Sequence, residues 1–345
     1  MSATLSNSTR AVGSDDTRTG AANTRATRPA VDLPTLGLVL LTYAAFGALT
    51  WFHASLAWWV LLPLGAIVVC FHGSLQHEAV HGFPFRAGWL NTALLLPSLN
   101  LWMPYTLYRD THLVHHRDED LTLPGIDPES FYLNESYWAQ LPTWQRAILR
   151  ASNTLLGRLT IGPVIVALAA FAQGIRGIAA GNRIAIRDWS LYAIGLGLIG
   201  WWVIGVCGMN PLFYVVCFAW PGTSLTLLRS FAEHRAAEDP AARTAIVEAG
   251  WFFSMLYLFN SYHVVHHDDP GLAWYRRGRR FHERRDAYLA GNGGYHFRSY
   301  RDVARRFGLR HREPVVHPFA GRMAGAMATQ LATTQPASTR PATTL

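Results

Sequence analysis

Nine of the fifteen histidines fall into short clusters whose spacing suits metal binding. The clusters are His77-x-x-x-His81, His112-x-x-His115-His116, the pair Glu233-His234, and His263-x-x-His266-His267. On a helix, positions three and four apart share a face, so each cluster presents its imidazoles together. One zinc site needs three or four ligands, whereas nine imidazoles match two metals, and nitrogen ligands suit iron, copper, nickel or zinc. We therefore expect these nine histidines to hold a di-metal site.

Other polar residues close to the clusters are further candidates. His72 lies five residues before His77, so it would join the ligands only if the helix bends. A histidine that binds a metal usually donates its second ring N–H to a carboxylate or carbonyl. The acidic residues beside the clusters could accept such bonds, or could be solvated charges at a membrane edge: Glu78, Asp110, Asp118, Glu233 and Asp268.

The composition indicates a membrane protein and excludes several classes of enzyme. Of the 345 residues, 50% are hydrophobic and only 15% are charged, against about a quarter in soluble domains. The three cysteines are far apart in apolar runs, which excludes a disulfide scaffold and an iron–sulfur cluster. All 30 basic residues are arginine, which excludes lysine Schiff bases and the phosphate loop of ATPases. The net charge of +8 comes from arginines that flank apolar runs, so no nucleic-acid partner is expected.

Four apolar runs are long enough to cross a bilayer, which takes about 20 residues. They cover residues 33–52, 56–75, 189–207 and 211–228. Two weaker runs, 89–107 and 159–172, are interrupted or short. If the histidine clusters form one site, they lie on one side of the membrane, and an even number of spans separates each consecutive pair. Neither weaker run is therefore expected to span.

These elements predict an all-α integral membrane protein with four transmembrane helices and a cytoplasmic helical cap that holds the histidine-rich di-metal site. Arginines before the third span and after the fourth place the metal site and both termini in the cytoplasm, by the positive-inside rule. The expected location is a bacterial inner membrane. The predicted organisation is a disordered tail at 1–31, a membrane domain at 32–318 and a second disordered tail at 319–345.

The histidine clusters, with Arg229-Ser-Phe-Ala-Glu233-His234 ahead of the last one, resemble the histidine boxes of membrane-bound fatty acid desaturases. The resemblance covers about residues 33–318. It implies two iron ions, held by about nine histidines, that activate O2 as co-substrate and remove hydrogens from an unactivated acyl chain. The implied substrate is a fatty acyl lipid, an acyl-CoA or an acyl-carrier-protein thioester among the membrane lipids.

Such a reaction needs two electrons from outside the acyl chain. The sequence has no four-cysteine cluster motif, dinucleotide fingerprint or fused cytochrome b5-like segment, so a separate ferredoxin or cytochrome-type donor is expected. The stretch 276–312 contains 12 arginines and could dock an acidic donor or anionic lipids; an ordinary cytoplasmic cap is the alternative.

Two other functions remain open at this stage. A hydroxylase or ketolase acting on an acyl chain or carotenoid would use the same ligands. A non-enzymatic metal-binding or metal-transport protein would bind metal without consuming oxygen. Transport predicts ionisable residues within the spans, where only His53 and His72 lie near a span interior.

Overall fold

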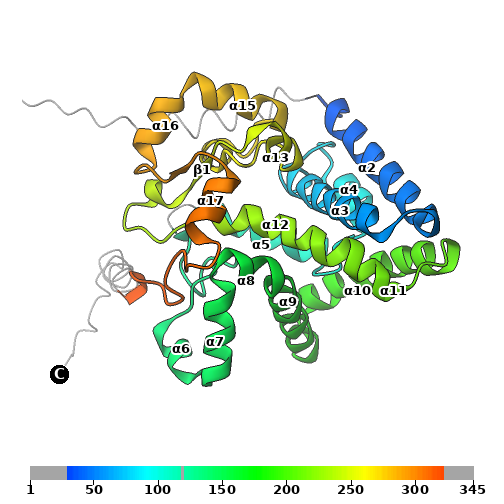
Figure 1. Cartoon of the computed structure of the whole chain (residues 1–345), viewed down its shortest axis with the longest axis horizontal. Coiled ribbons are helices and arrows are strands. Elements are labelled where there is room, and N and C mark those ends of the chain that lie inside the picture. Colours follow the sequence, from blue (N-terminus) through cyan, green and yellow to red (C-terminus); the bar gives the residue numbers. More distant parts are fainter. Residues whose placement is uncertain (1–28, 118–119, 322–345) are drawn as a thin grey trace, which may run out of the picture.

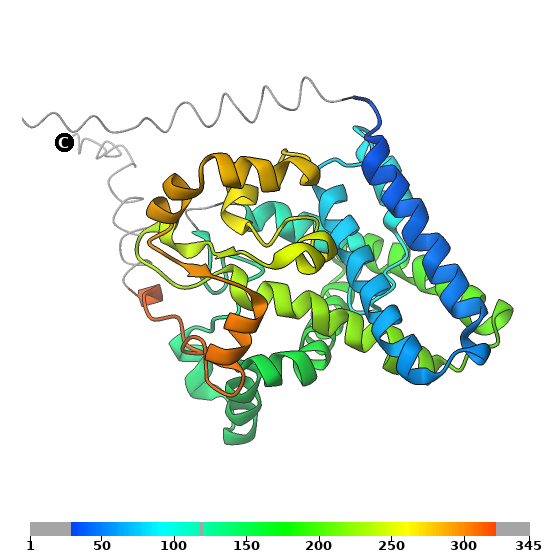
Figure 2. The same ribbon diagram turned by 45° about the horizontal axis from the view of Figure 1, so that its top comes forward.

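The computed structural model describes residues 29–117 and 120–321. Both predicted tails lie almost wholly outside these residues, and so does Asp118. The described chain is mostly helical, as expected; its one small sheet is a parallel pair of two-residue strands, β1 (Ile246–Val247) and β2 (His296–Phe297). The long helices lie side by side, and the shorter elements gather near one end of them (Figures 1 and 2).

Five helices of the described chain are long and apolar enough to cross a membrane. They are α2 (Leu33–Trp51), α3 (Trp58–Val80), α9 (Gly162–Ala179), α10 (Arg183–Gly200) extended by the π-helical η3 (Trp201–Val206), and α11 (Pro211–Tyr214) continued by the π-helical η4 (Val215–Ala219) and α12 (Trp220–Glu233). Four of the five overlap the four apolar runs predicted to span, with ends that differ by up to six residues.

The fifth helix, α9, differs from the prediction for residues 159–172. It has 18 residues because the helix continues through Arg176, which lies in its last turn, where a cation is favourable beside the helix dipole. The helix ends before Gly181, whose φ of 69° is left-handed and suits glycine. Apolar side chains of α9 remain exposed along one stripe: Val164, Leu168, Phe171, Ile175 and Ile178.

Close packing of α3 against η4 and α12 brings the ends of two long helices to one place. A Cβ on Gly222 would lie 2.5 Å from Cβ of Val69, and a Cβ on Gly65 would lie 2.5 Å from the carbonyl oxygen of Cys217. Small residues at such contacts allow membrane helices to approach closely. The carboxyl ends of α3 and α12, which carry the first cluster and the Glu233-His234 pair, therefore lie together.

The remaining elements are short. The run at 89–107 forms α4 (Gly88–Leu95) followed by a non-helical segment up to the start of α5 (Tyr105–His115), so it is not one long helix. The second histidine cluster lies at the end of α5, and the third, His263-x-x-His266-His267, lies on α14 (His263–Asp268). The short elements are η1 (His53–Ser55), α4 (Gly88–Leu95), α5 (Tyr105–His115), α6 (Glu135–Gln140), α7 (Thr143–Ser152), α8 (Leu155–Thr160), η5 (Pro240–Arg243), α13 (Gly250–Leu256), α14 (His263–Asp268), α15 (Trp274–Glu283), α16 (Arg285–Gly291) and α17 (Tyr300–Phe307).

Candidate metal centre

The structure brings the nine clustered histidines together in two groups. Group one contains His77, His81, His112, His116 and His266, and group two contains His115, His234, His263 and His267. Within each group, one ring nitrogen from every member lies within 4.8 Å of those of the others. Both groups draw on α14 and on the carboxyl end of α5. The carboxyl end of α3 completes the first group, and His234, directly after α12, completes the second. The second and third clusters are therefore shared between the groups.

The Nε2 atoms of these rings converge at distances that fit a metal ion. The Nε2 atom of His234 lies 3.0 Å from that of His115 and 2.9 Å from that of His263. In the other group, Nε2 of His116 lies 3.1 Å from that of His112 and 3.0 Å from that of His266. Two nitrogens bound at right angles to one metal, at about 2.1 Å each, lie about 3.0 Å apart.

Hydrogen bonding between the rings does not account for this arrangement. A neutral imidazole nitrogen carries either one proton or one in-plane lone pair. The Nε2 atoms of His116 and His234 nevertheless each face two other Nε2 atoms. A cation shared by the converging lone pairs satisfies all of them, so the donor set fits a metal ion in each group.

Hydrogen-bond acceptors at Nδ1 orient four of the rings. When Nδ1 carries the proton and donates it, Nε2 keeps its lone pair for a metal. The Nδ1–acceptor pairs are His115 with Asp127 at 2.9 Å, His112 with Glu129 at 2.9 Å, His77 with Glu78 at 3.2 Å and His263 with Asn260 at 3.3 Å.

Asp127 and Glu129 were not among the acidic residues selected from the sequence. They belong to the loop between α5 and α6. This loop brings Asp127 back to His115, 12 residues earlier in the chain, and Glu129 back to His112, 17 residues earlier. The backbone N–H groups of Thr122 and Glu129 donate to the Asp127 carboxylate at 2.8 and 2.9 Å, and these bonds fix its position. The sequence feature that indicates these two residues is a pair of acids within three residues, Asp127-Pro-Glu129, shortly after the second histidine cluster.

Asn260 also went unpredicted, and it contacts members of both groups. Its Nδ2 lies 3.5 Å from Nε2 of His77, in group one, and 3.4 Å from Oε1 of Glu233. That Glu233 oxygen is 3.3 Å from Nδ1 of His263, in group two. The preceding residues, Leu258 and Phe259, have φ values of 48° and 58°. A left-handed backbone conformation costs about 1–3 kcal/mol of free energy per residue. The contacts that Asn260 makes therefore have to offset this cost.

Three of the predicted polar residues lie away from the two groups. Asp110 forms ion pairs with Arg109 and Arg187, and Asp268 accepts a hydrogen bond from the Tyr288 hydroxyl at 2.7 Å. His72 is buried in α3 with its Nε2 3.3 Å from the Tyr43 hydroxyl, and it belongs to neither group. Glu78 and Glu233, by contrast, each place a carboxylate oxygen near Nδ1 of a grouped histidine, His77 at 3.2 Å and His263 at 3.3 Å.

The electrostatics of the site favour neutral rings. Burial, together with neighbouring histidines, holds the pKa of His116, His234, His263 and His266 well below the ordinary value. Neutral imidazole is the form that binds metals. The exception is His115: burial lowers its pKa, but Glu129 and Asp127 outweigh this and raise the pKa to about 9.

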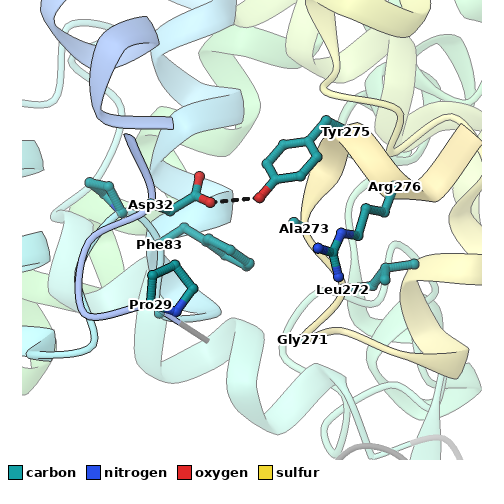
Figure 3. A pocket seen from close by; sticks show the side chains of 10 residues that line it. Pro29, Asp32, Phe83, Gly271, Leu272, Ala273, Tyr275 and Arg276 are labelled. Carbon is teal, nitrogen blue, oxygen red and sulfur yellow. Dashed lines mark hydrogen bonds between the residues drawn. The ribbon is translucent and has the colours of Figure 1, made fainter. Parts of the chain in front are cut away.

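A small pocket of about 90 Å³ lies near the site, between the start of α2 and the start of α15 (Figure 3). Gly82 and Phe83, which follow His81 directly, form part of its wall. The Tyr275 hydroxyl donates to the Asp32 carboxylate across it at 2.8 Å (Figure 3). None of the nine grouped histidines lines this pocket, so it does not identify an acyl channel.

Comparison with known proteins assigns the family. No curated protein matches the chain significantly. The family model described as fatty acid desaturase matches residues 53–299, which is more than half of the chain and includes all nine grouped histidines. With its helices of spanning length and its two histidine groups, this chain belongs to the fatty acid desaturase family.

Proposed function

We propose that the protein is an O2-dependent, di-iron fatty acyl desaturase of the membrane. The observation that carries this proposal is the convergence of one ring nitrogen from each histidine in two groups, five histidines in one and four in the other. All-nitrogen ligation by neutral rings is compatible with iron. Two iron ions bound there would supply the activation of O2 that attack on an unactivated C–H bond requires.

The atoms and electrons of the proposed reaction balance as follows. Two hydrogens leave adjacent carbons of the acyl chain, and a C=C bond forms between those carbons. Together with two electrons and two protons from outside, they reduce one O2 to two molecules of water. We assign the electrons to a separate ferredoxin or cytochrome-type donor, and the acyl chain to a lipid, coenzyme A or acyl-carrier-protein carrier.

In this proposal the polar residues around the histidines position them. Asp127 and Glu129 accept the Nδ1 protons of His115 and His112, so both rings present Nε2 to the metals. Asn260 contacts both groups and holds the third cluster against the first. Removing such a partner typically costs about 10–100-fold in metal affinity or activity.

The proposed topology has four spans, with α9 lying along the membrane surface. The contact between His115 and His234 requires both residues on one side of the membrane. Three helices of spanning length, α9, α10 with η3, and α11 to α12, separate these residues in sequence, and three crossings would place them on opposite sides. The exposed apolar stripe of α9 suits a helix in the interface. The arginines that flank the spans support a cytoplasmic side for the metal site.

A lipid profile tests the proposed reaction. The protein and its His266→Ala variant are expressed in a bacterium, and the acyl lipids are compared by mass spectrometry. We expect an acyl species two mass units lighter, absent from His266→Ala and retained by the matched control His72→Ala. A species sixteen units heavier would instead indicate a hydroxylase. Purified protein that contains iron but leaves every acyl chain unchanged, with a donor supplied, would contradict the proposal.

A further inference from the structure

Arg158, on α8, is a buried arginine without a carboxylate partner. Its side chain stacks on Phe131, with Cζ 4.0 Å from the ring centroid, and its Nε donates to the Ser152 carbonyl at 3.0 Å. Only 7% of the residue is exposed, yet no acidic group of the described chain lies within ion-pair distance of it. A buried charge is costly unless it is paired and hydrogen-bonded.

The other deeply buried arginines have their charge compensated by carboxylates or by several backbone carbonyls. Arg277 and Arg229 form ion pairs with Glu78 and Glu233, at 2.7 and 2.9 Å. The Arg243 guanidinium donates to three backbone carbonyls, those of Leu121, Ala237 and Glu238. Arg158 has one backbone carbonyl and an aromatic face, which leaves its terminal N–H groups available to a ligand.

A second cation, Arg312, lies beside Arg158. The chain after α17 is hydrogen-bonded to the region where α7 meets α8: Arg312 N donates to the Asn153 carbonyl at 3.2 Å, and Leu156 N to the Gly308 carbonyl at 3.0 Å (Figure 1). The two guanidinium carbons lie 5.4 Å (Arg312) and 5.9 Å (Arg158) from the Phe231 ring centroid. Burial and the Arg312 charge together lower the pKa of Arg158 to about 9.

Among the described residues, no carboxylate forms an ion pair with either cation. Burial lowers the pKa of Arg312, but Tyr295, Tyr132 and Glu313 outweigh this and raise it. Arg312 Nη1 donates to the neutral Tyr295 hydroxyl at 2.6 Å, and its buried Nε has no partner in the described segments. The acid next to it, Glu313, accepts a hydrogen bond from the Tyr132 hydroxyl at 3.2 Å and makes no ion pair with either arginine in the part of the chain that the structure covers. Two guanidinium groups in this arrangement suit a phosphate, which arginine recognises by paired N–H bonds.

The cation pair is also close to the metal centre. Both guanidinium groups lie within 6 Å of the Phe231 ring centroid. Phe231 precedes His234 by three residues at the end of α12. Three residues of helix correspond to about 5 Å along its axis. We propose that Arg158 and Arg312 together bind the phosphate group of an acyl-bearing molecule and so hold its acyl chain beside the two histidine groups. This rests on the proposed desaturase function. Such a phosphate occurs in phospholipid headgroups and in coenzyme A thioester carriers.

Ligand-induced stabilisation of the purified full-length protein tests the proposal without requiring turnover. The thermal midpoint is measured at fixed ionic strength with coenzyme A, with dihexanoyl phosphatidylglycerol, or with inorganic phosphate. The variants are Arg158→Gln and Arg312→Gln. The matched control is Arg150→Gln, which removes the same charge from an exposed position on α7. We expect the wild type and Arg150→Gln to bind one phosphate-bearing compound, and both site variants to bind it about tenfold or more weakly.

Each outcome decides the matter. A response to coenzyme A alone identifies a thioester carrier, and a response to phosphatidylglycerol alone identifies a lipid headgroup; either supports the proposal. Equal weakening in Arg150→Gln, a response to inorganic phosphate alone, or no response to any of the three compounds overturns it. If Arg158→Gln fails to fold, Arg158→Lys and Arg312→Gln carry the test. Intact binding together with an unchanged lipid profile would contradict the desaturase function and leave the phosphate site standing.

Discussion

Glu78 and Arg277 form an ion pair in which neither side chain is exposed to solvent. The Arg277 guanidinium donates to both carboxylate oxygens, at 2.7 and 2.9 Å. The same guanidinium donates to the Leu258 carbonyl at 3.2 Å, and the same carboxylate lies 3.2 Å from Nδ1 of His77. The pair therefore joins α15 to the first histidine cluster and to the left-handed turn that precedes Asn260.

Breaking this pair should destabilise the fold strongly. Arg277→Met leaves the Glu78 carboxylate buried and uncompensated, and we expect a loss of about 3–5 kcal/mol in the free energy of unfolding. The double variant Glu78→Met/Arg277→Met should lose much less than the sum of the two single variants. Thermal unfolding in detergent measures the cycle, with the exposed Arg279→Met as control because Arg279 is 84% exposed in its pair with Glu283. Additive losses would show that the two charges are not coupled.

The pH dependence of metal binding should depend on Asp127. Because the pKa of His115 is raised to about 9, the metal must displace a proton from this ring at any lower pH, and the apparent affinity should rise from pH 7 towards 9. Asp127→Asn removes a charge that raises this pKa, so the rise should shift to lower pH. Iron titrations of metal-free protein at several pH values measure this. Asp268→Asn is the control, because Asp268 hydrogen-bonds Tyr288 instead; an unshifted profile in Asp127→Asn would contradict the assignment.

Single alanine substitutions should separate ligands from bystanders. His115→Ala removes one of the four rings of group two, and His266→Ala removes one of the five rings of group one. Both should abolish turnover and lower the iron content while membrane insertion persists, because neither residue lies in a spanning helix. His72→Ala should retain its iron. Metal analysis of the three purified variants is the measurement, and full iron occupancy in His115→Ala would remove that residue from the ligand set.

The orientation of α9 is open to cysteine labelling. In a background without the native cysteines, Gln145→Cys precedes α9, Ala180→Cys follows it and Asn210→Cys lies beyond α10. If α9 lies along the membrane surface, positions 145 and 180 should react with an impermeant reagent from the same side, and position 210 from the other. Labelling of 145 and 180 from opposite faces would mean that α9 crosses the membrane.

The sequence predicted the long helices because apolar runs of about 20 residues are typical of membrane-spanning helices. The apolar run at 159–172 is shorter than α9, because the helix continues through Arg176, a charged residue in its last turn. The sequence also identified the residues of both histidine groups, because positions three and four apart on a helix necessarily share a face.

The division of the histidines into groups could not be predicted. Adjacent helical residues point about 100° apart, so His115 and His116 cannot both face one point, but nothing local decides which of them faces which partner. The positions of Asp127 and Asn260 at the site could not be predicted for a related reason. A loop returns Asp127 to the histidines, and two left-handed residues direct Asn260 towards them. These are long-range and strained features without a periodic signature.

The sharing of the second and third clusters between the two groups has a consequence for how the protein matures. His116 and His266 meet across 150 residues of chain, and His115 and His234 meet across 119, so neither histidine group is complete in a nascent chain that lacks the carboxyl-terminal third. Since His115 adjoins His116 and His266 adjoins His267, a first ion that fixes one member of each pair also aligns the other. Filling one position of the proposed centre therefore prepares its neighbour, and the two ions should load cooperatively once synthesis is complete.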